Sequence, residues 1–185
     1  MSERRLKNKD VELLASIALG LRGEYEKADA ARWQGSPFEW ILHRPSRQRG
    51  KIGEQLIAGW CAARGFDVVR SPDSDADRII EGERVEIKFS TEWENGQYVF
   101  QQLRDQNYKF LICIGISPFD AQIWIFNKKD IPFKKLKHQH GGERGHDTWW
   151  IGFKPGNPPE WMNKRGSFVE VYKIFSSLRK NRKHP

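Results

Sequence analysis

The sequence predicts an α/β or α+β protein with a central mixed sheet flanked by helices, and three observations carry this prediction. Residues 110–116 form a continuous apolar run, which is typical of a strand covered on both faces. Residues 51–64 have the apolar spacing of an amphipathic helix. Within residues 77–88, two short apolar runs flank a Glu-Gly pair, which predicts a tight β-hairpin. Strands and helices mixed in this way form a layered sandwich.

The region before residue 51 is predicted to be helical. Residues 10–33 carry apolar side chains at a helical spacing that Gly20 and Gly23 interrupt, so we expect one or two helices. An aromatic-rich patch follows at residues 38–42. Two roles fit this region: helical packing that flanks the core, or a dimerisation or DNA-facing element.

The helix over residues 51–64 ends before Gly65, which suits a C-terminal cap. Glu54 lies near its apolar stripe, where a solvated position would be more usual. It is either an ordinary surface glutamate or a further carboxylate directed at a functional site.

The hairpin brings three charged residues to one face. If residues 81 and 82 form the turn, Asp77 stands opposite Glu86, and Lys88 shares their face because residues two apart on a strand point the same way. Asp73 and Asp75 precede Asp77 in a turn-rich link after a short strand at residues 66–70. Placing either of them opposite Glu86 would move the turn, so Asp77 is the preferred partner.

The facing carboxylates indicate a metal site. Two carboxylates opposed across strands repel each other unless a cation lies between them. Oxygen ligands select a hard ion such as Mg²⁺, which takes one or two carboxylates and completes its shell with water and phosphate oxygens. The substrate class indicated is a phosphodiester.

The remaining elements follow in order. A polar loop at residues 90–96 contains Trp93, and residues 98–107 are predicted to be a helix with Phe100 and Leu103 on one side. A strand is expected at residues 122–127 and a helix at residues 167–178, with Ser167 and Glu170 placed as a capping box. Counted from Lys51, the predicted core order is α-β-β-β-α-β-β.

Length and charge suggest one domain with a basic end. The 185 residues suffice for a single domain, divided into an N-terminal helical region (1–50), a core (51–127) and a basic C-terminal extension (128–185). Net charge is +8, and the last segment alone holds 14 Lys and Arg against 5 Asp and Glu, which leaves residues 1–127 at −1. Such clustering is typical of contact with a phosphate backbone, although a solubilising surface looks similar.

The cysteines and the apolar runs indicate the cellular compartment of the protein. Cys61 and Cys113 sit inside apolar segments, as small core residues in a reducing compartment do. The N-terminus has no apolar stretch behind its basic residues, and no run is long enough to span a bilayer. We expect an intracellular, cytoplasmic protein without a membrane partner.

The hairpin and its neighbours resemble the PD-(D/E)xK nuclease superfamily, which includes restriction endonucleases and Holliday-junction resolvases. The resemblance rests on Asp77, a spacer with a turn, and Glu86-Ile87-Lys88, preceded by a helix that carries Glu54. It covers residues 51–127 and implies a restriction-endonuclease-like core. Two features depart from the family pattern. Pro72-Asp73 lies four residues ahead of Asp77, which leaves Asp73 as an alternative ligand. Arg104 stands where the exonuclease branch has glutamine four before Tyr108.

The resemblance implies a role for each residue. Asp77 and Glu86 would bind Mg²⁺, with Mn²⁺ as a substitute, and the backbone carbonyl of Ile87 would be an extra ligand. Lys88 would orient or help deprotonate the attacking water and stabilise charge in the transition state. Glu54 would hold a second metal or a metal-bound water. No organic cofactor is implied.

The basic segment supplies the candidate DNA contacts. Side chains that reach phosphates and groove edges are expected at residues 134–150 and 160–165. The candidates are Lys134, Lys135, Lys137, His138, His140, Arg144, His146, Lys164 and Arg165. An alternative interpretation is that the three histidines bind a metal ion. A Gly-rich loop that contacts DNA, or a simple polar loop, fits better, because no cysteine is near and no helix fixes the spacing of the histidines.

The expected function is Mg²⁺-dependent cleavage of duplex DNA by a sequence-specific enzyme similar to type II restriction endonucleases, which implies a prokaryotic source and restriction–modification. The material added on both sides of the core favours this over a minimal resolvase. The alternatives are a structure-specific resolvase or repair nuclease, and a DNA-binding module of the same fold that cuts nothing. A homodimer is expected because two strands must be cut.

Overall fold

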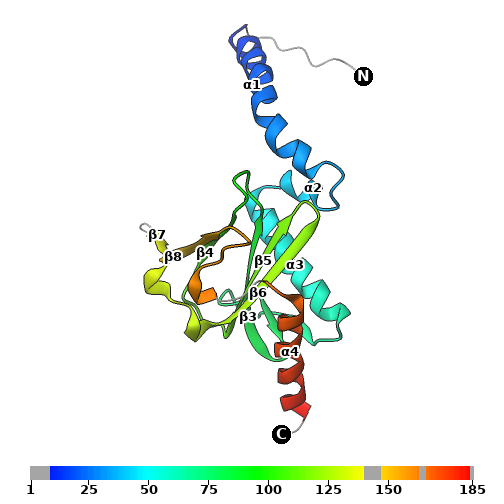
Figure 1. The fold of residues 1–185 in the computed structure, drawn as a ribbon, viewed down its shortest axis with the longest axis vertical. Coiled ribbons are helices and arrows are strands. Elements are labelled where there is room, and N and C mark those ends of the chain that lie inside the picture. The colour runs from blue at the N-terminus through cyan, green and yellow to red at the C-terminus, as the bar shows by residue number, and fades with distance from the viewer. Residues whose placement is uncertain (1–8, 140–146, 163–165, 184–185) are drawn as a thin grey trace.

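Two sheets pack face to face in the computed structural model, which describes residues 9–139, 147–162 and 166–183. The central sheet has the order β1-β2-β3-β5-β6 and the smaller sheet the order β4-β8-β7. Helices α3 and α4 cover the other face of the central sheet (Figure 1). The predicted mixed α/β architecture is confirmed.

The central sheet is mixed. Its β1-β2, β2-β3 and β5-β6 pairs are antiparallel, and β3 and β5 run parallel. β5 is buried along nearly its whole length, as its unbroken apolar run predicts. The bounds are β1 Val68–Arg70, β2 Arg78–Ile80, β3 Glu83–Thr91, β5 Phe110–Ser117 and β6 Asp120–Asn127.

Two helices complete the first hydrophobic core. From α3 (Ser46–Ala63), Ile57 and Cys61 are fully buried, and α4 (Phe168–Lys183) contributes Val171 and Phe175. The segment predicted as a basic extension therefore supplies part of this core. The helix predicted at residues 167–178 is confirmed and extends to Lys183.

The second core lies between the two sheets. It joins aromatic side chains of β4 (Tyr98–Leu103) and β8 (Thr148–Phe153) to the face of the central sheet that α3 and α4 leave open. The third strand is β7 (Lys137–Gln139), and short 3₁₀ turns occur at Lys128–Asp130, Phe133–Lys135 and Glu160–Met162. Cys61 and Cys113 are buried free thiols, as predicted.

The helix predicted at residues 98–107 is wrong, because this segment forms strand β4. Tyr98 and Phe100 point into the second core and Val99 points outward, so the apolar side chains follow a period of two. A bulge at Gln102, whose φ is +55°, returns Leu103 to the buried face. The core order from Lys51 is therefore α followed by six strands, and the connection between parallel strands β3 and β5 passes through the second sheet.

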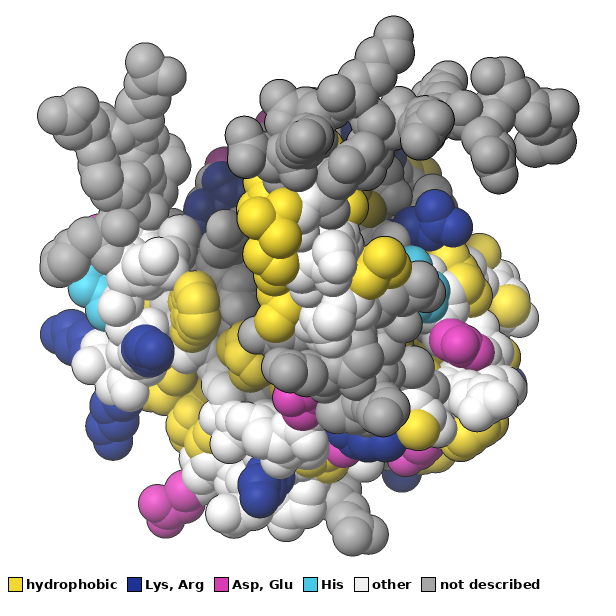
Figure 2. Space-filling view, turned by 90° about the horizontal axis from the view of Figure 1, so that it is seen from above, with side chains coloured by type: hydrophobic (Ala, Val, Ile, Leu, Met, Phe, Trp, Pro, Cys, Tyr) yellow, Lys and Arg dark blue, Asp and Glu magenta, His cyan; other side chains and the backbone are white. Residues whose placement is uncertain are grey.

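Helix α1 (Lys9–Trp33) is a single helix that projects from the body of the molecule (Figure 1). Its last residue, Trp33, is fully buried in the first core. Farther from the body its large apolar side chains are exposed, and Figure 2, which looks down on this end, shows hydrophobic side chains open to solvent. The exposed residues are Val11, Leu13, Leu14, Ile17, Leu19 and Leu21. Packing of these residues against the core, one of the two expected roles, is therefore not what the fold shows.

Candidate active site

The predicted hairpin is present with the predicted register. Ile80 pairs with Glu83, Ile79 with Arg84 and Arg78 with Val85. The turn residues Glu81 and Gly82 have φ values of +49° and +81°, the left-handed pair that a two-residue hairpin requires. Turn chemistry alone therefore fixes which side chains of β3 share a face.

Asp77 continues the hydrogen bonding between the two strands of the hairpin, partly through its side chain. Strand β2 begins at Arg78, so its pairing with β3 ends at Val85. The Asp77 backbone N–H donates to the Val85 carbonyl at 3.0 Å, and Asp77 Oδ2 accepts from the Ile87 N–H at 2.8 Å. The carboxylate thus satisfies an edge donor and is held next to the middle of β3.

Glu86 and Lys88 point to the face between the two sheets. They lie beside Leu111 and Cys113 of β5, whose side chains belong to the second core. Lys88 Nζ is 2.8 Å from Glu86 Oε1, and only 4% of the Glu86 side chain is exposed. A carboxylate this deeply buried is uncommon unless it is paired, and Lys88 supplies the paired charge.

The electrostatics of Asp77 show that the charged residues act on one another. Burial raises the pKa of Asp77 to about 6, and the negative charges of Glu86 and Glu54 add to the rise. The Ile87 N–H and the Lys88 ammonium act in the opposite direction. The structure therefore brings Asp77, Glu86 and Lys88 together, and Glu54 on α3 is near enough for its charge to raise the pKa of Asp77.

Glu54 reaches this site from α3, and two cations hold it. Its Oε2 is 2.5 Å from Lys51 Nζ and 3.1 Å from an Arg78 guanidinium nitrogen. Arg78 also donates to the Asp77 carbonyl at 2.7 Å, so one guanidinium joins the helix to the start of β2. Sequence reasoning missed Arg78. The sequence did contain a signal for it. In the predicted hairpin Arg78 stands opposite Val85 and so shares its apolar face, where a buried cation needs an anion nearby.

The donor set fits a hard divalent ion held by two carboxylates. Among the described residues, no three His, Cys, Asp or Glu side chains form a ready-made metal cluster. Glu54 is engaged by two cations, Arg78 and Lys51, and Glu86 by Lys88. The charge of Glu86 raises the pKa of Asp77 more than that of Glu54 does, so Asp77 and Glu86 are the pair whose mutual repulsion a cation would relieve most. Mg²⁺ commonly takes one or two carboxylates and keeps its remaining positions for water and phosphate oxygens.

Asp73, the alternative acid, lies elsewhere. Its carboxylate forms an ion pair with Arg84 and accepts the Asp75 N–H at 2.9 Å. The hydrogen bond from Arg84 lowers the pKa of Asp73. Arg84 pairs with Ile79, toward the turn and away from the Asp77 end of the hairpin, so the geometry favours Asp77 at the site.

The candidate DNA-contacting residues are only partly within the described residues. Lys134, Lys135 and Lys137 are at the surface around β7. The ring of His138 is 5.3 Å from that of Trp149, and its Nε2 is 3.3 Å from Asp147 Oδ1. His140, Arg144, His146, Lys164 and Arg165 lie outside the described residues, so only His138 of the alternative three-histidine metal site is described.

Comparisons with known proteins add a structural likeness. No family model and no curated protein matches the chain. The solved structure of a bacterial homing endonuclease, I-Ssp6803I, is similar at 15% sequence identity, with a TM-score of 0.48. The match covers 74% of this chain and 98% of the other. Among the described residues, no helix is both long enough and apolar enough to cross a membrane.

Proposed function

We propose that the chain is a divalent-metal-dependent endonuclease that hydrolyses phosphodiester bonds of duplex DNA. The observation that carries the proposal is the convergence of Asp77, Glu86 and Lys88 on one face of the hairpin, with the pKa of Asp77 raised by burial and by neighbouring carboxylates. Two acids and a lysine at one site are suited to placing a cation and a nucleophilic water against a phosphate. The net charge of +8 favours a polyanionic substrate.

Each residue has a defined part in this proposal. Asp77 and Glu86 would hold Mg²⁺, or Mn²⁺ in its place, with the Ile87 carbonyl as an extra ligand. The ion would supply Lewis-acid polarisation of the phosphate and a water of lowered pKa. Lys88, fixed by Glu86 at 2.8 Å, would orient the water and stabilise negative charge that develops on the phosphate. Glu54, held by Arg78 and Lys51, would hold a second metal or a metal-bound water.

Cleavage of a large unmodified DNA with added Mg²⁺ tests the proposal. Wild type is expected to cut, and Glu86→Gln should cut at least about a thousand-fold more slowly, since a lost metal ligand costs several kcal/mol of transition-state stabilisation. Glu83→Gln is the matched control, because Glu83 lies on the same strand but pairs with Lys109. Equal rates for wild type and Glu86→Gln would refute the assigned site.

The finer proposal is sequence-specific cleavage by a homodimer, as in type II restriction enzymes. We expect cleavage to give discrete DNA fragments, and we expect sedimentation to give a mass twice that of one chain. Preferential cutting of branched DNA would instead favour a structure-specific nuclease, and DNA binding without cleavage would favour a binding module.

A further inference from the structure

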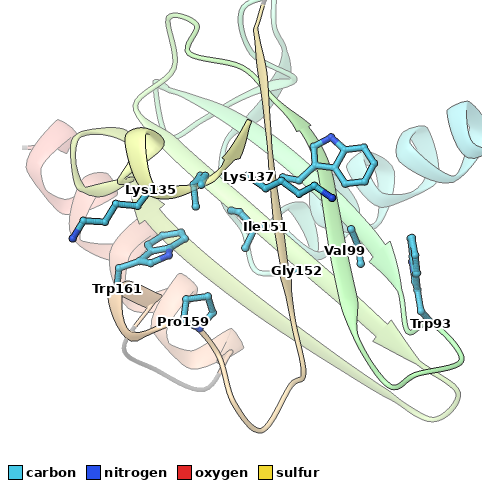
Figure 3. Close-up of a pocket in the computed structure, with 10 residues that line it drawn as sticks. Trp93, Val99, Lys135, Lys137, Ile151, Gly152, Pro159 and Trp161 are labelled. Atoms are coloured by element: carbon cyan, nitrogen blue, oxygen red, sulfur yellow. The ribbon is translucent and has the colours of Figure 1, made fainter. Parts of the chain in front are cut away.

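A pocket of about 510 Å³ opens on the second sheet, and the proposed chemistry makes no use of it. Its volume is in the range of small-ligand sites. Its walls combine aromatic rings with lysines, and Figure 3 shows Trp93 and Trp161 on opposite sides of the pocket. The wall residues are Trp93, Trp150, Trp161, Pro159, Lys135 and Lys137.

The aromatic walls come from distant parts of the chain and are held in place. Pro159 and Trp161 belong to one turn, closed by the Met162 N–H donating to the Pro159 carbonyl at 2.8 Å. The Trp161 ring packs on Phe126 with centroids 5.1 Å apart. These contacts fix the Trp161 side of the pocket before any ligand arrives.

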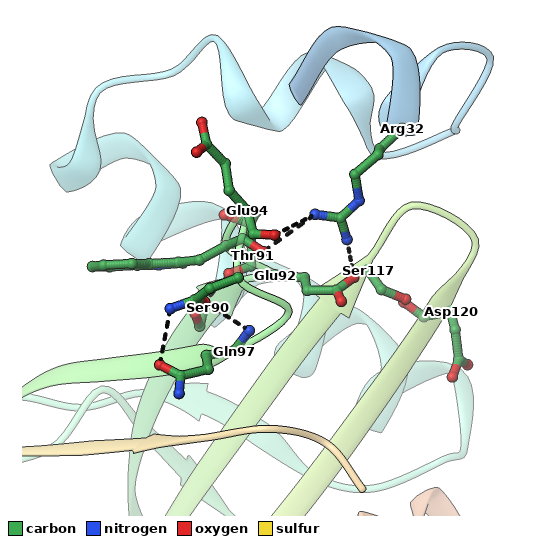
Figure 4. Close-up of polar contacts among 10 residues, drawn as sticks. Arg32, Ser90, Thr91, Glu92, Glu94, Gln97, Ser117 and Asp120 are labelled. Carbon is green, nitrogen blue, oxygen red and sulfur yellow. Dashed lines mark hydrogen bonds and ion pairs between the residues drawn. The ribbon is translucent and has the colours of Figure 1, made fainter. Parts of the chain in front are cut away.

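Trp93 stands on a loop that α1 anchors. The Trp93 N–H donates to the Gln97 carbonyl at 2.8 Å, and the Trp93 carbonyl accepts from the Gly96 N–H at 2.8 Å and from Arg32 at 3.3 Å. Arg32 also forms an ion pair with Glu92 at 3.0 Å (Figure 4). Trp93 itself remains 45% exposed. A tethered loop that presents an exposed aromatic ring loses little entropy on binding a flat ligand.

The floor of the pocket is flat and apolar. Val99 of β4 pairs with Gly152 of β8, and both point to the outer side of the second sheet. A Cβ at Gly152 would meet nothing closer than 3.8 Å, so the glycine leaves the space above the strand open. Such a floor accepts the face of a planar ring.

The charge of the walls selects an anionic ligand. Lys137 Nζ lies 5.3 Å from the centroid of the Trp150 ring, and Lys135 lines the pocket on the side of Trp161 (Figure 3). None of the described residues that line the pocket is acidic. Aromatic pockets also bind quaternary ammonium groups, but two lysines without a carboxylate would repel such a cation.

We propose that this pocket binds one unpaired DNA base together with its phosphate, an inference that rests on the proposed function because it takes DNA to be the substrate. Paired bases in a duplex present only their edges, so the flat faces of tryptophans contact a base only after it leaves the stack. Stacking on the indoles holds the base regardless of its identity, and the lysines bind the phosphate.

The pocket lies within reach of the hairpin site. Trp93 follows Lys88 by five residues, so their Cα atoms are at most about 18 Å apart. That length corresponds to the rise of about five base pairs. This spacing is short enough for one DNA molecule that passes around the edge of the second sheet to contact both places.

Binding of three fluorescent duplexes in EDTA tests the inference: one fully paired, one with a single bulged nucleotide, and one with a bulged abasic site that keeps the phosphate but lacks the base. Wild type should bind the bulged base about ten-fold tighter than the abasic bulge, an effect of the size that aromatic stacking on one base provides. Trp93→Ala and Trp161→Ala should bring this ratio close to one. Equal affinity of wild type for the two bulges would overturn the inference.

Two further variants make the result specific. Trp40→Ala removes an exposed tryptophan of α2 (Glu39–Leu42) that does not line the pocket, and it should keep the ratio. Trp161→Phe keeps an aromatic ring and should keep most of the ratio, which guards against misfolding of the alanine variant. A ratio unchanged in a folded Trp161→Ala protein would also overturn the inference.

The same experiment separates this inference from the nuclease proposal. Glu86→Gln should lose Mg²⁺-dependent cleavage and keep the preference for the bulged base. Base-dependent binding by a wild type that cuts no DNA would support the pocket and refute the nuclease. Cleavage together with equal binding of the two bulges would support the nuclease and refute the pocket.

Discussion

Asp77 is the residue in which the structural and chemical roles of the hairpin meet. Its carboxylate accepts the Ile87 N–H at the edge of β3, and burial raises its pKa to about 6. In an unfolded chain the pKa of an aspartate is about 3.9. The folded state therefore keeps a proton that the unfolded state has lost, so without metal the contribution of Asp77 to stability falls as the pH rises through 6.

The fall in stability with rising pH gives a prediction for the metal-free protein. Between pH 5 and pH 7.5, wild type in EDTA should lose about 1 kcal/mol more of its free energy of unfolding than Asp77→Asn, which keeps the acceptor but cannot ionise. Denaturant unfolding at the two pH values measures the difference. Added Mg²⁺ should stabilise wild type more at pH 7.5 than at pH 5, because protons compete for the ligand. Identical pH slopes in wild type and Asp77→Asn would contradict the assigned environment.

The ion pair of Arg78 and Glu54 has a coupling free energy that can be measured. Both side chains are more than four-fifths buried, so removing either leaves the other charge poorly compensated. We expect Arg78→Gln to lower the free energy of unfolding by about 2 kcal/mol, with a coupling to Glu54→Gln of about 1 kcal/mol or more. A double-mutant cycle measures this coupling.

The matched control is the ion pair of Lys109 with Glu83, which is 2.5 Å long but more exposed. Its coupling should stay below about 0.5 kcal/mol. Equal couplings for the two pairs would show that burial does not give the Arg78–Glu54 contact its strength.

At the scale of elements, the close approach of the two sheets is decided by Gly115 of β5. A Cβ at this position would lie 2.6 Å from the ring of Tyr98 in β4. Tyr98 is 1% exposed and has rings on two sides, so it has little room to move. The second sheet can therefore cover the central sheet only because one strand lacks a side chain at this crossing.

Gly115→Ala should lower the free energy of unfolding by about 1–3 kcal/mol, since overpacking forces strands or rings apart. Thermal or urea unfolding measures the change. Gly59→Ala is the control, because an added Cβ on α3 meets nothing within 4 Å. That variant should gain up to about 1 kcal/mol from helix propensity. Destabilisation of similar size in both variants would refute the role of the crossing.

Elements with a strong local signal were predicted well, and β4 was not. The hairpin depends on two turn residues, and β5 on an unbroken apolar run, so both are visible within about ten residues. In β4, Phe100 and Leu103 also fit a helical spacing, and the glutamines after Phe100 suit a helix. The segment forms a strand, with Tyr98 and Phe100 on one face, because it pairs with β8, some 50 residues later in the chain.

At the scale of the molecule, the described residues between 128 and 183 are part of the fold. Strand β8 completes the second core and α4 the first, so removing everything after Asp130 would expose both cores. The role of the basic surface is therefore tested by substitution.

Replacing Lys134, Lys135 and Lys137 by glutamine should weaken DNA binding and reduce the slope of log K against log salt by up to about 3, since each phosphate contact contributes about 0.9. Fluorescence anisotropy at several salt concentrations measures the slope. Lys173→Gln with Lys180→Gln on α4, on the far side of the central sheet, is the control and should leave the slope nearly unchanged. An unchanged slope in the triple variant would remove this surface from the DNA interface.

The sequence by itself determined the hairpin register, the shared face of Asp77, Glu86 and Lys88, and the doubly covered strand β5. These features depend on turn chemistry and on a residue period, which act between near neighbours in the chain. Only the tertiary structure decided that Arg78 binds Glu54, that β4 pairs with β8, and that the tryptophans on three separate segments line one pocket. Such contacts join residues far apart in sequence, and they are selected by burying the two faces of one sheet at the same time.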